Sequence, residues 1–97
     1  MESHVTTLLG FLARLDNSKL TPRDIRIMAG IERAPGCCGN DLVVALRLPS
    51  RSSVQANIPK LIRRGMIDDL RAREGSAIPS RLFLTEEGKR FLQEMFA

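Results

Sequence analysis

Residues 41–65 read DLVVALRLPSRSSVQANIPKLIRRG and contain two helical patterns separated by a short turn. The first pattern belongs to a helix expected near 38–46. The second predicts a helix near 50–64 that is capped by Ser50 and ended by Gly65, where glycine readily takes a positive φ. Its apolar residues recur at helical spacing and form one buried face: Val54, Ile58, Leu61 and Ile62.

The opposite face of the helix near 50–64 is built from small and polar residues: Arg51, Ser52, Gln55, Ala56, Pro59 and Arg63. Small side chains near a helix N-terminus permit close approach to DNA bases, and glutamine can pair with adenine through two hydrogen bonds. The N-terminus also favours a phosphate. Pro59 lacks an N–H, so it leaves the Gln55 carbonyl without its helical donor and should bend the helix.

After Met66 the apolar pattern changes from helical to strand-like. Met66-Ile67 with Leu70 predicts one strand, residues 81–84 predict another, and residues 72–79 form the tip between them. Helix, turn, helix and hairpin is the order of a winged helix-turn-helix. The expected fold is mainly α with a small β-hairpin, with helices near 3–15, 21–33, 38–46 and 50–64, a wing at 66–84 and a C-terminal helix at 85–97.

The remaining helices carry clear start and stop signals. The helix near 3–15 has a broad apolar face and is expected to end at the polar loop Asp16-Asn17-Ser18. Thr21, Pro22 and Asp24 predict the start of the next helix, as a capping box with aspartate in the place of the usual glutamate. Thr85 is expected to be the N-cap of the last helix, where Glu86-Glu87 favour the positive N-terminus.

Composition limits the class of protein. The 97 residues, 43% hydrophobic and 27% charged, are those of one globular domain, 1–97. No apolar run is long enough to span a bilayer and no signal peptide is apparent, so we expect a cytoplasmic protein without membrane contact. The net charge is +4, and residues 47–73 hold seven Lys and Arg against two Asp. A basic surface concentrated in this way is typical of a polyanion binder.

Catalytic and metal chemistry find little support in the residues. The one histidine, His4, lies three residues from the N-terminus and near no catalytic motif, and Glu86-Glu87 is explained by the helix start. Two cysteines and a distant histidine are too few for a metal site. Cys37-Cys38 leaves two readings open: thiols activated near a helix N-terminus as a redox switch, or a packed turn. We therefore predict no enzyme, no metal and no cofactor.

Several stretches resemble the MarR type of winged-helix transcriptional regulator: Leu20 to Ile25, Asp41 to Leu46 followed by Ser50 to Val54, Leu61 to Ile67, and Arg81 to Gly88. The resemblance covers roughly residues 20–92. It implies a homodimer on a palindromic DNA site, with residues 50–57 at the bases and Arg73 at the wing. MarR proteins usually build their dimer and ligand cleft from long helices after the wing, where this chain is short, so no small-molecule effector is expected.

These patterns lead to a set of expected site residues. The base-reading residues are Arg51, Ser52, Gln55 and Ala56. The residues expected on the DNA backbone or in the wing groove are Ser50, Ser53, Asn57, Lys60, Arg63, Arg71 and Arg73. The expected dimer interface is Val5, Leu8, Leu9, Leu12, Phe91, Leu92, Met95 and Phe96. The main hypothesis is a homodimeric repressor that binds double-stranded DNA. The alternatives are a winged-helix module for protein partners and a thiol-responsive DNA-binding sensor.

Overall fold

The computed structural model describes residues 2–70 and 80–95. In chain order the elements are α1 (Glu2–Ser18), α2 (Pro22–Arg33), α3 (Gly39–Ala45), α4 (Ser52–Gln55), α5 (Asn57–Arg63), β1 (Ile67–Asp69), β2 (Leu82–Leu84) and α7 (Glu86–Met95). The expected class, mainly α with a small hairpin in winged helix-turn-helix order, is confirmed. Most of the predicted wing tip, residues 71–79, lies outside the described residues.

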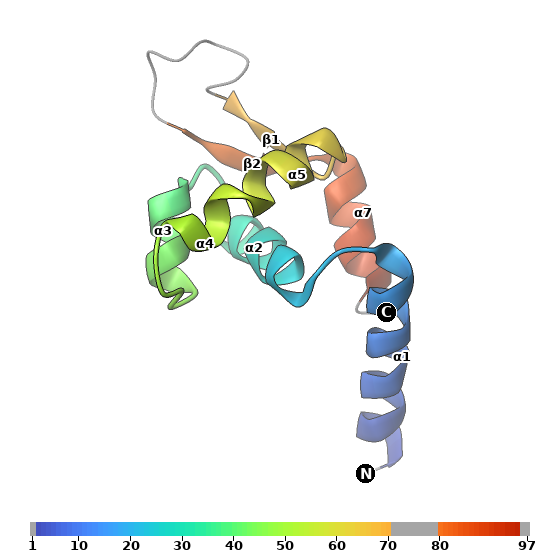
Figure 1. The fold of residues 1–97 in the computed structure, drawn as a ribbon. Helices are drawn as coiled ribbons and strands as arrows, with labels where there is room; N and C mark the ends of the chain where they lie inside the picture. The colour runs from blue at the N-terminus through green and yellow to red at the C-terminus, as the bar shows by residue number, and fades with distance from the viewer. Residues whose placement is uncertain (1, 71–79, 96–97) are drawn as a thin grey trace.

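Helix α1 projects from the body of the molecule, and its C-terminal part lies beside α7 (Figure 1). The projection makes the molecule elongated, with extents of 51 × 28 × 21 Å. The predicted loop at Asp16-Asn17-Ser18 is wrong, since α1 continues through Ser18. Asp16 and Asn17 lie on the exposed side, where polar residues do not oppose a helix. The helix ends because Lys19 takes a φ of 63°.

Helix α2 forms the centre of the core, with Ile27, Met28 and Ile31 fully buried. The predicted capping box at its start is confirmed. The Asp24 backbone N–H donates to Thr21 Oγ1 at 3.2 Å, and the Thr21 N–H donates to Asp24 Oδ2 at 2.8 Å. These reciprocal bonds satisfy donors that a helix start leaves without partners.

The predicted helix near 50–64 is divided into α4 and α5 at Ala56. The break follows from Pro59, which has no N–H to donate to the Gln55 carbonyl four residues earlier. Ala56 keeps helical angles, φ −83° and ψ −31°, so the backbone stays in the helical region where the two helices meet. The bend that Pro59 was expected to cause lies here. The role predicted for Ser50 is corrected, because its Oγ lies 2.6 Å from Ser52 Oγ and α4 begins only at Ser52.

Glycine at the end of α5 has the expected conformation. Gly65 takes a φ of 73°, and the N–H groups of Gly65 and Met66 donate to the Ile62 and Leu61 carbonyls at 3.0 Å. This pair of bonds is the Schellman arrangement that ends helices at a left-handed residue. It turns the chain directly from α5 into β1.

Strands β1 and β2 pair antiparallel, with Ile67 opposite Leu84 and Asp69 opposite Leu82. Leu82 also bridges to Cys37 in the loop between α2 and α3, which the sequence did not predict: the Leu82 N–H donates to the Cys37 carbonyl at 2.8 Å. The predicted cap at Thr85 is confirmed, since Thr85 Oγ1 accepts from the Gly88 N–H at 3.0 Å. Strand β2 is thereby joined to β1 on one edge and to the loop between α2 and α3 through Leu82.

Candidate nucleic-acid interface

The exposed side of α4 and α5 is the side that the sequence predicted. Val54 and Leu61 are buried in the core, whereas the four expected base-reading residues and two of their neighbours are exposed: Arg51, Ser52, Gln55, Ala56, Pro59 and Arg63. Gln55 stands at the end of α4, beside the bend at Ala56. The segment therefore presents guanidinium, hydroxyl and amide groups on one accessible surface, at the N-terminal end of the bent helix.

Some of the residues expected on the DNA backbone are placed differently. Ser53 is only 8% exposed, so the expectation that it contacts DNA is corrected: in an amphipathic helix Ser53 shares the inward face of Val54. Ser50 and Arg63 are exposed. Arg71 and Arg73 lie outside the described residues.

Asp24 is the residue of this region that sequence reasoning missed. It was expected only as a helix cap, yet its side chain is completely buried and joins α2 to α5. Asn57 Nδ2 donates to Asp24 Oδ1 at 2.6 Å, and Lys60 Nζ donates to Asp24 Oδ2 at 2.7 Å. Asn57 and Lys60 were expected to hold phosphates, and in this structure both are engaged by this carboxylate. The signal that the sequence did contain was the spacing of Asn57 and Lys60, which are three positions apart and therefore lie on one face of a helix.

The environment of Asp24 shifts its titration. Burial raises the pKa of Asp24, but hydrogen bonds from Asn57, Lys60 and Thr21 outweigh burial and bring the pKa below its ordinary value of 3.8. A carboxyl whose pKa is lower in the folded state stabilises the fold fully above the unfolded pKa. That stabilisation is lost as the pH falls through the folded pKa.

We expect wild-type protein to lose stability below about pH 3.8 more steeply than Asp24→Asn, which has no carboxyl to protonate there. Urea midpoints measured between about pH 2.5 and pH 6 would show the difference. Parallel pH profiles for the two proteins would contradict the assigned ionisation of Asp24.

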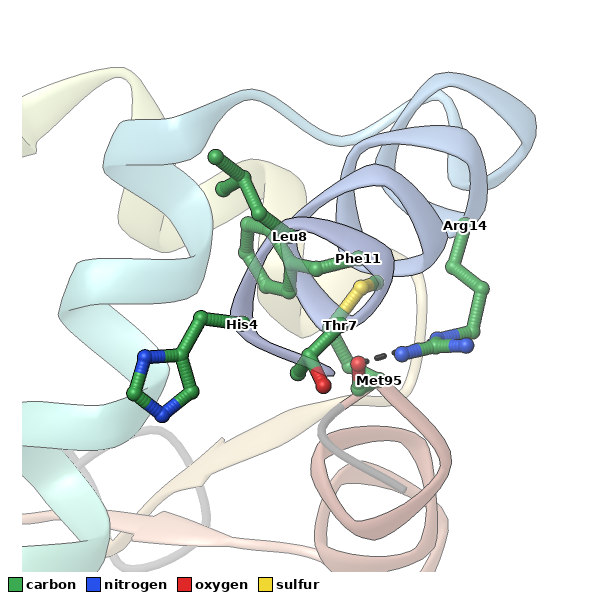
Figure 2. A pocket seen from close by; sticks show the side chains of 6 residues that line it. All are labelled: His4, Thr7, Leu8, Phe11, Arg14 and Met95. Atoms are coloured by element: carbon green, nitrogen blue, oxygen red, sulfur yellow. Dashed lines mark hydrogen bonds between the residues drawn. The ribbon is translucent and has the colours of Figure 1, made fainter. Parts of the chain in front are cut away.

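A groove of about 380 Å³ lies where α1 meets α7. Figure 2 shows its lining residues, which are His4, Thr7, Leu8, Phe11, Arg14 and Met95. Arg14 Nε donates to the Met95 carbonyl at 3.0 Å, which joins the two helices at one end of the groove. Leu8 is also one of the exposed large apolar residues of α1, so the groove adjoins the apolar side of this helix.

The two cysteines occupy different environments. Cys37 is buried, and burial together with the nearby Asp41 charge raises the pKa of its thiol. A raised pKa disfavours the thiolate that redox chemistry requires. Cys38 is half-buried, and its N–H donates to Asp41 Oδ2 at 3.1 Å at the start of α3. At Cys37 the environment therefore fits the packed turn better than the redox switch.

Solved structures with the same architecture are winged-helix regulators. The repressor CouR bound to a 23-mer DNA duplex superposes with a TM-score of 0.72 over 97% of this chain, at 20% identity. The multiple antibiotic-resistance repressor MarR from Listeria monocytogenes gives 0.78 over 97%, also at 20% identity. The chain has the MarR-type winged-helix fold. A mutant of MepR from S. aureus bound to an oligodeoxyribonucleotide has the MarR-type fold too, with a TM-score of 0.78 over 98% of this chain and 18% identity.

The resemblance to MarR-type regulators that the sequence predicted is thus confirmed for the fold. No protein-family model and no curated protein sequence matches the chain. The chain spans 65% of the CouR structure, 62% of the Listeria protein and 68% of MepR. Within residues 2–70 and 80–95, no helix is both long and apolar enough to cross a membrane. The same part of the chain holds no group of His, Cys, Asp and Glu side chains that could bind a metal ion.

Proposed function

We propose that this protein is a non-enzymatic regulator of transcription that binds double-stranded DNA through α4 and the start of α5. The observation that carries the proposal is the exposed face of α4 in a MarR-type fold, where Arg51, Ser52 and Gln55 are accessible together. Two of the structurally similar proteins are bound to DNA in their solved structures. In a helix-turn-helix, residues near the N-terminus of the second helix reach base edges in the major groove.

The proposed roles follow from the chemistry of the exposed side chains. Arg51 and Gln55 read bases, because a guanidinium pairs with guanine and an amide with adenine, each through two hydrogen bonds. Ser52 and Ala56 are small enough to let the backbone approach the groove. Arg63 and Ser50 bind phosphates and set the register without reading sequence. Arg71 and Arg73 are proposed for the wing on their charge and position in the chain.

Selection of bound sites from random duplex DNA is the experiment that tests this function. We expect an enriched site with two similar half-sites, whose centres are about one helical turn apart if the protein binds as a dimer. Absence of enrichment, together with no affinity for any duplex at low salt, would reject DNA binding. Such an outcome would favour the winged-helix module for protein partners.

Gln55→Ala should weaken binding to the selected site by about 1–3 kcal/mol and leave binding to random DNA almost unchanged. The matched control is Arg63→Gln, which should weaken both DNAs alike and reduce the magnitude of the slope of log K against log salt by about one per bound protomer, or about two for a dimer. Fluorescence anisotropy at several salt concentrations measures both quantities. An equal loss on both DNAs for Gln55→Ala would contradict its role as a base reader.

We propose further that the protein is a homodimer and represses by occupying its site. The support is an apolar stripe on α1, where Val5, Leu8, Leu9 and Leu12 are 59%, 56%, 62% and 44% exposed. The four lie at helical spacing on one side, and an apolar stripe of this kind is typical of an interface. Two residues of the interface expected from the sequence are corrected. Leu92 and Met95, at 4% and 2% exposed, are core residues of this chain, because α7 turns them inward.

Leu9→Glu should convert the dimer to a monomer without unfolding the protomer, because Leu9 is already exposed in the single chain. Its control is Val44→Glu on α3, where a valine that is 78% exposed lies away from the stripe. Sedimentation velocity at micromolar concentration distinguishes the two variants. If wild-type protein is monomeric at all concentrations, or if Leu9→Glu stays dimeric, the proposed interface is wrong. Phe91 is half-buried and Phe96 lies outside the described residues, so this test does not depend on them.

A further inference from the structure

We propose that Asp24 is a positioning residue of the DNA-binding surface: it holds α5 through Asn57 and Lys60 and keeps the Lys60 ammonium out of contact with DNA phosphates. The inference deepens the proposed function and rests on it. It also reverses an expectation, since a lysine in a basic recognition helix would ordinarily be counted among the phosphate contacts.

The contacts around Asp24 leave its carboxylate fully used. Oδ1 accepts from Asn57 Nδ2 at 2.6 Å, while Oδ2 accepts from Lys60 Nζ at 2.7 Å and from the Thr21 N–H at 2.8 Å. The Asp24 side chain has no exposed surface, and the Lys60 side chain is 30% exposed. The carboxylate therefore lies behind the lysine, inside the protein.

This arrangement favours Asp24 over DNA as the partner of Lys60. A phosphate that drew Lys60 outward would leave a buried carboxylate without its cation, and an unpaired buried charge is strongly unfavourable. A phosphate on DNA can instead be neutralised by an arginine that is already exposed, such as Arg63. The basic composition of residues 47–73 thus overstates the number of cations available to DNA.

The position of the cluster also explains how α5 is held after the bend. The break at Ala56 and the missing N–H of Pro59 weaken the helical connection between α4 and α5. Asn57 and Lys60 stand on either side of Pro59, and both are tied to the same carboxylate at the start of α2. Both anchored residues belong to α5, so the anchor on α2 holds α5 in place on the C-terminal side of the break.

Counting phosphate contacts by salt dependence tests the inference in the chain of residues 1–97. Introduced into the wild-type protein, Lys60→Gln should leave the slope of log K against log salt unchanged, whereas Arg63→Gln reduces the magnitude of the slope by about one per bound protomer. Asp24→Asn should increase the magnitude by about one per bound protomer, because Lys60 is released toward the DNA. Lys60→Gln in the Asp24→Asn background should then reduce the magnitude by about one per bound protomer again. This last pair avoids an unpaired buried carboxylate, so it stays informative if Lys60→Gln alone fails to fold.

The outcomes separate the inference from the proposed function. If wild-type protein binds DNA and the Asp24→Asn slope equals the wild-type slope, or Lys60→Gln reduces the magnitude of the wild-type slope by about one per bound protomer, the inference is overturned while the function stands. If no duplex is bound at low salt, the proposed function fails, and with it the inference that Asp24 withholds Lys60 from DNA. The anchoring of α5 is then decided by urea midpoints of the Asp24→Asn and Lys60→Gln single and double variants. We expect strongly non-additive shifts, and additive shifts would overturn the anchor as well.

Discussion

Replacing Asp24 by alanine should lower the free energy of unfolding by about 3 kcal/mol. The change leaves the Lys60 ammonium and the Asn57 amide without their shared acceptor, and it also removes one half of the capping box of α2. Breaking a buried ion pair from one side typically costs about 3–5 kcal/mol. We expect the lower end of this range because the Lys60 side chain is 30% exposed and can turn toward water.

Urea unfolding followed by circular dichroism measures this loss, with the slope of the transition as a check that unfolding stays two-state. The matched control is Asp16→Ala, an aspartate on the exposed side of α1, for which we expect a change within about 0.5 kcal/mol. A loss at Asp24 no larger than that of the control would show that the carboxylate does not hold α2 and α5 together.

Gly88→Ala should destabilise the protein by about 2–3 kcal/mol, the upper part of the range for overpacking. A Cβ at Gly88 would overlap the carbonyl oxygen of Met66. The obstructing atom belongs to the backbone, which enters the wing at this point and is tied to Thr85 by hydrogen bonds. No side-chain rotation relieves the overlap, so α7 or the start of β1 must move.

Gly10→Ala is the matched control for Gly88→Ala and should have the opposite sign. Gly10 lies within α1, and the nearest atom to a Cβ there is the end of the flexible Arg14 side chain at 3.3 Å. Alanine in a helix interior stabilises by about 0.5–1 kcal/mol relative to glycine. Thermal unfolding of the two variants in one buffer compares them directly. Equal effects of the two substitutions would contradict the close approach of α7 to the wing.

Local signals in the sequence predicted most of the helix starts and stops correctly. Thr21 with Asp24, Gly65 and Thr85 each act on neighbouring backbone groups within a few residues. Their effect therefore depends little on the rest of the fold. The end of α1 was predicted wrongly, because polar composition alone does not end a helix. The polar residues before Ser18 read as a loop, but on an exposed helix face they are neutral, and the helix stops only at Lys19.

The candidate interface was predicted in part. Periodicity separated the buried and exposed faces of α4 and α5, because the side that carries Val54 and Leu61 must turn inward. It failed for Ser53, whose polarity suggested solvent although its position in the helix turns it inward. It also failed for Leu92 and Met95, because an apolar helix edge does not tell whether its own core or a second chain covers it.

By itself the sequence determined the order of helices and hairpin, the bend at Pro59 and the exposed face of α4, since each depends on spacing along one segment. Tertiary structure alone decided the partner of Lys60, the bridge between Cys37 and Leu82, and which terminal residues are core. These pairings join residues far apart in the chain. A lysine is attracted to a phosphate and to a carboxylate alike, and only the burial of Asp24 beneath α5 determines which of the two it contacts in this protein.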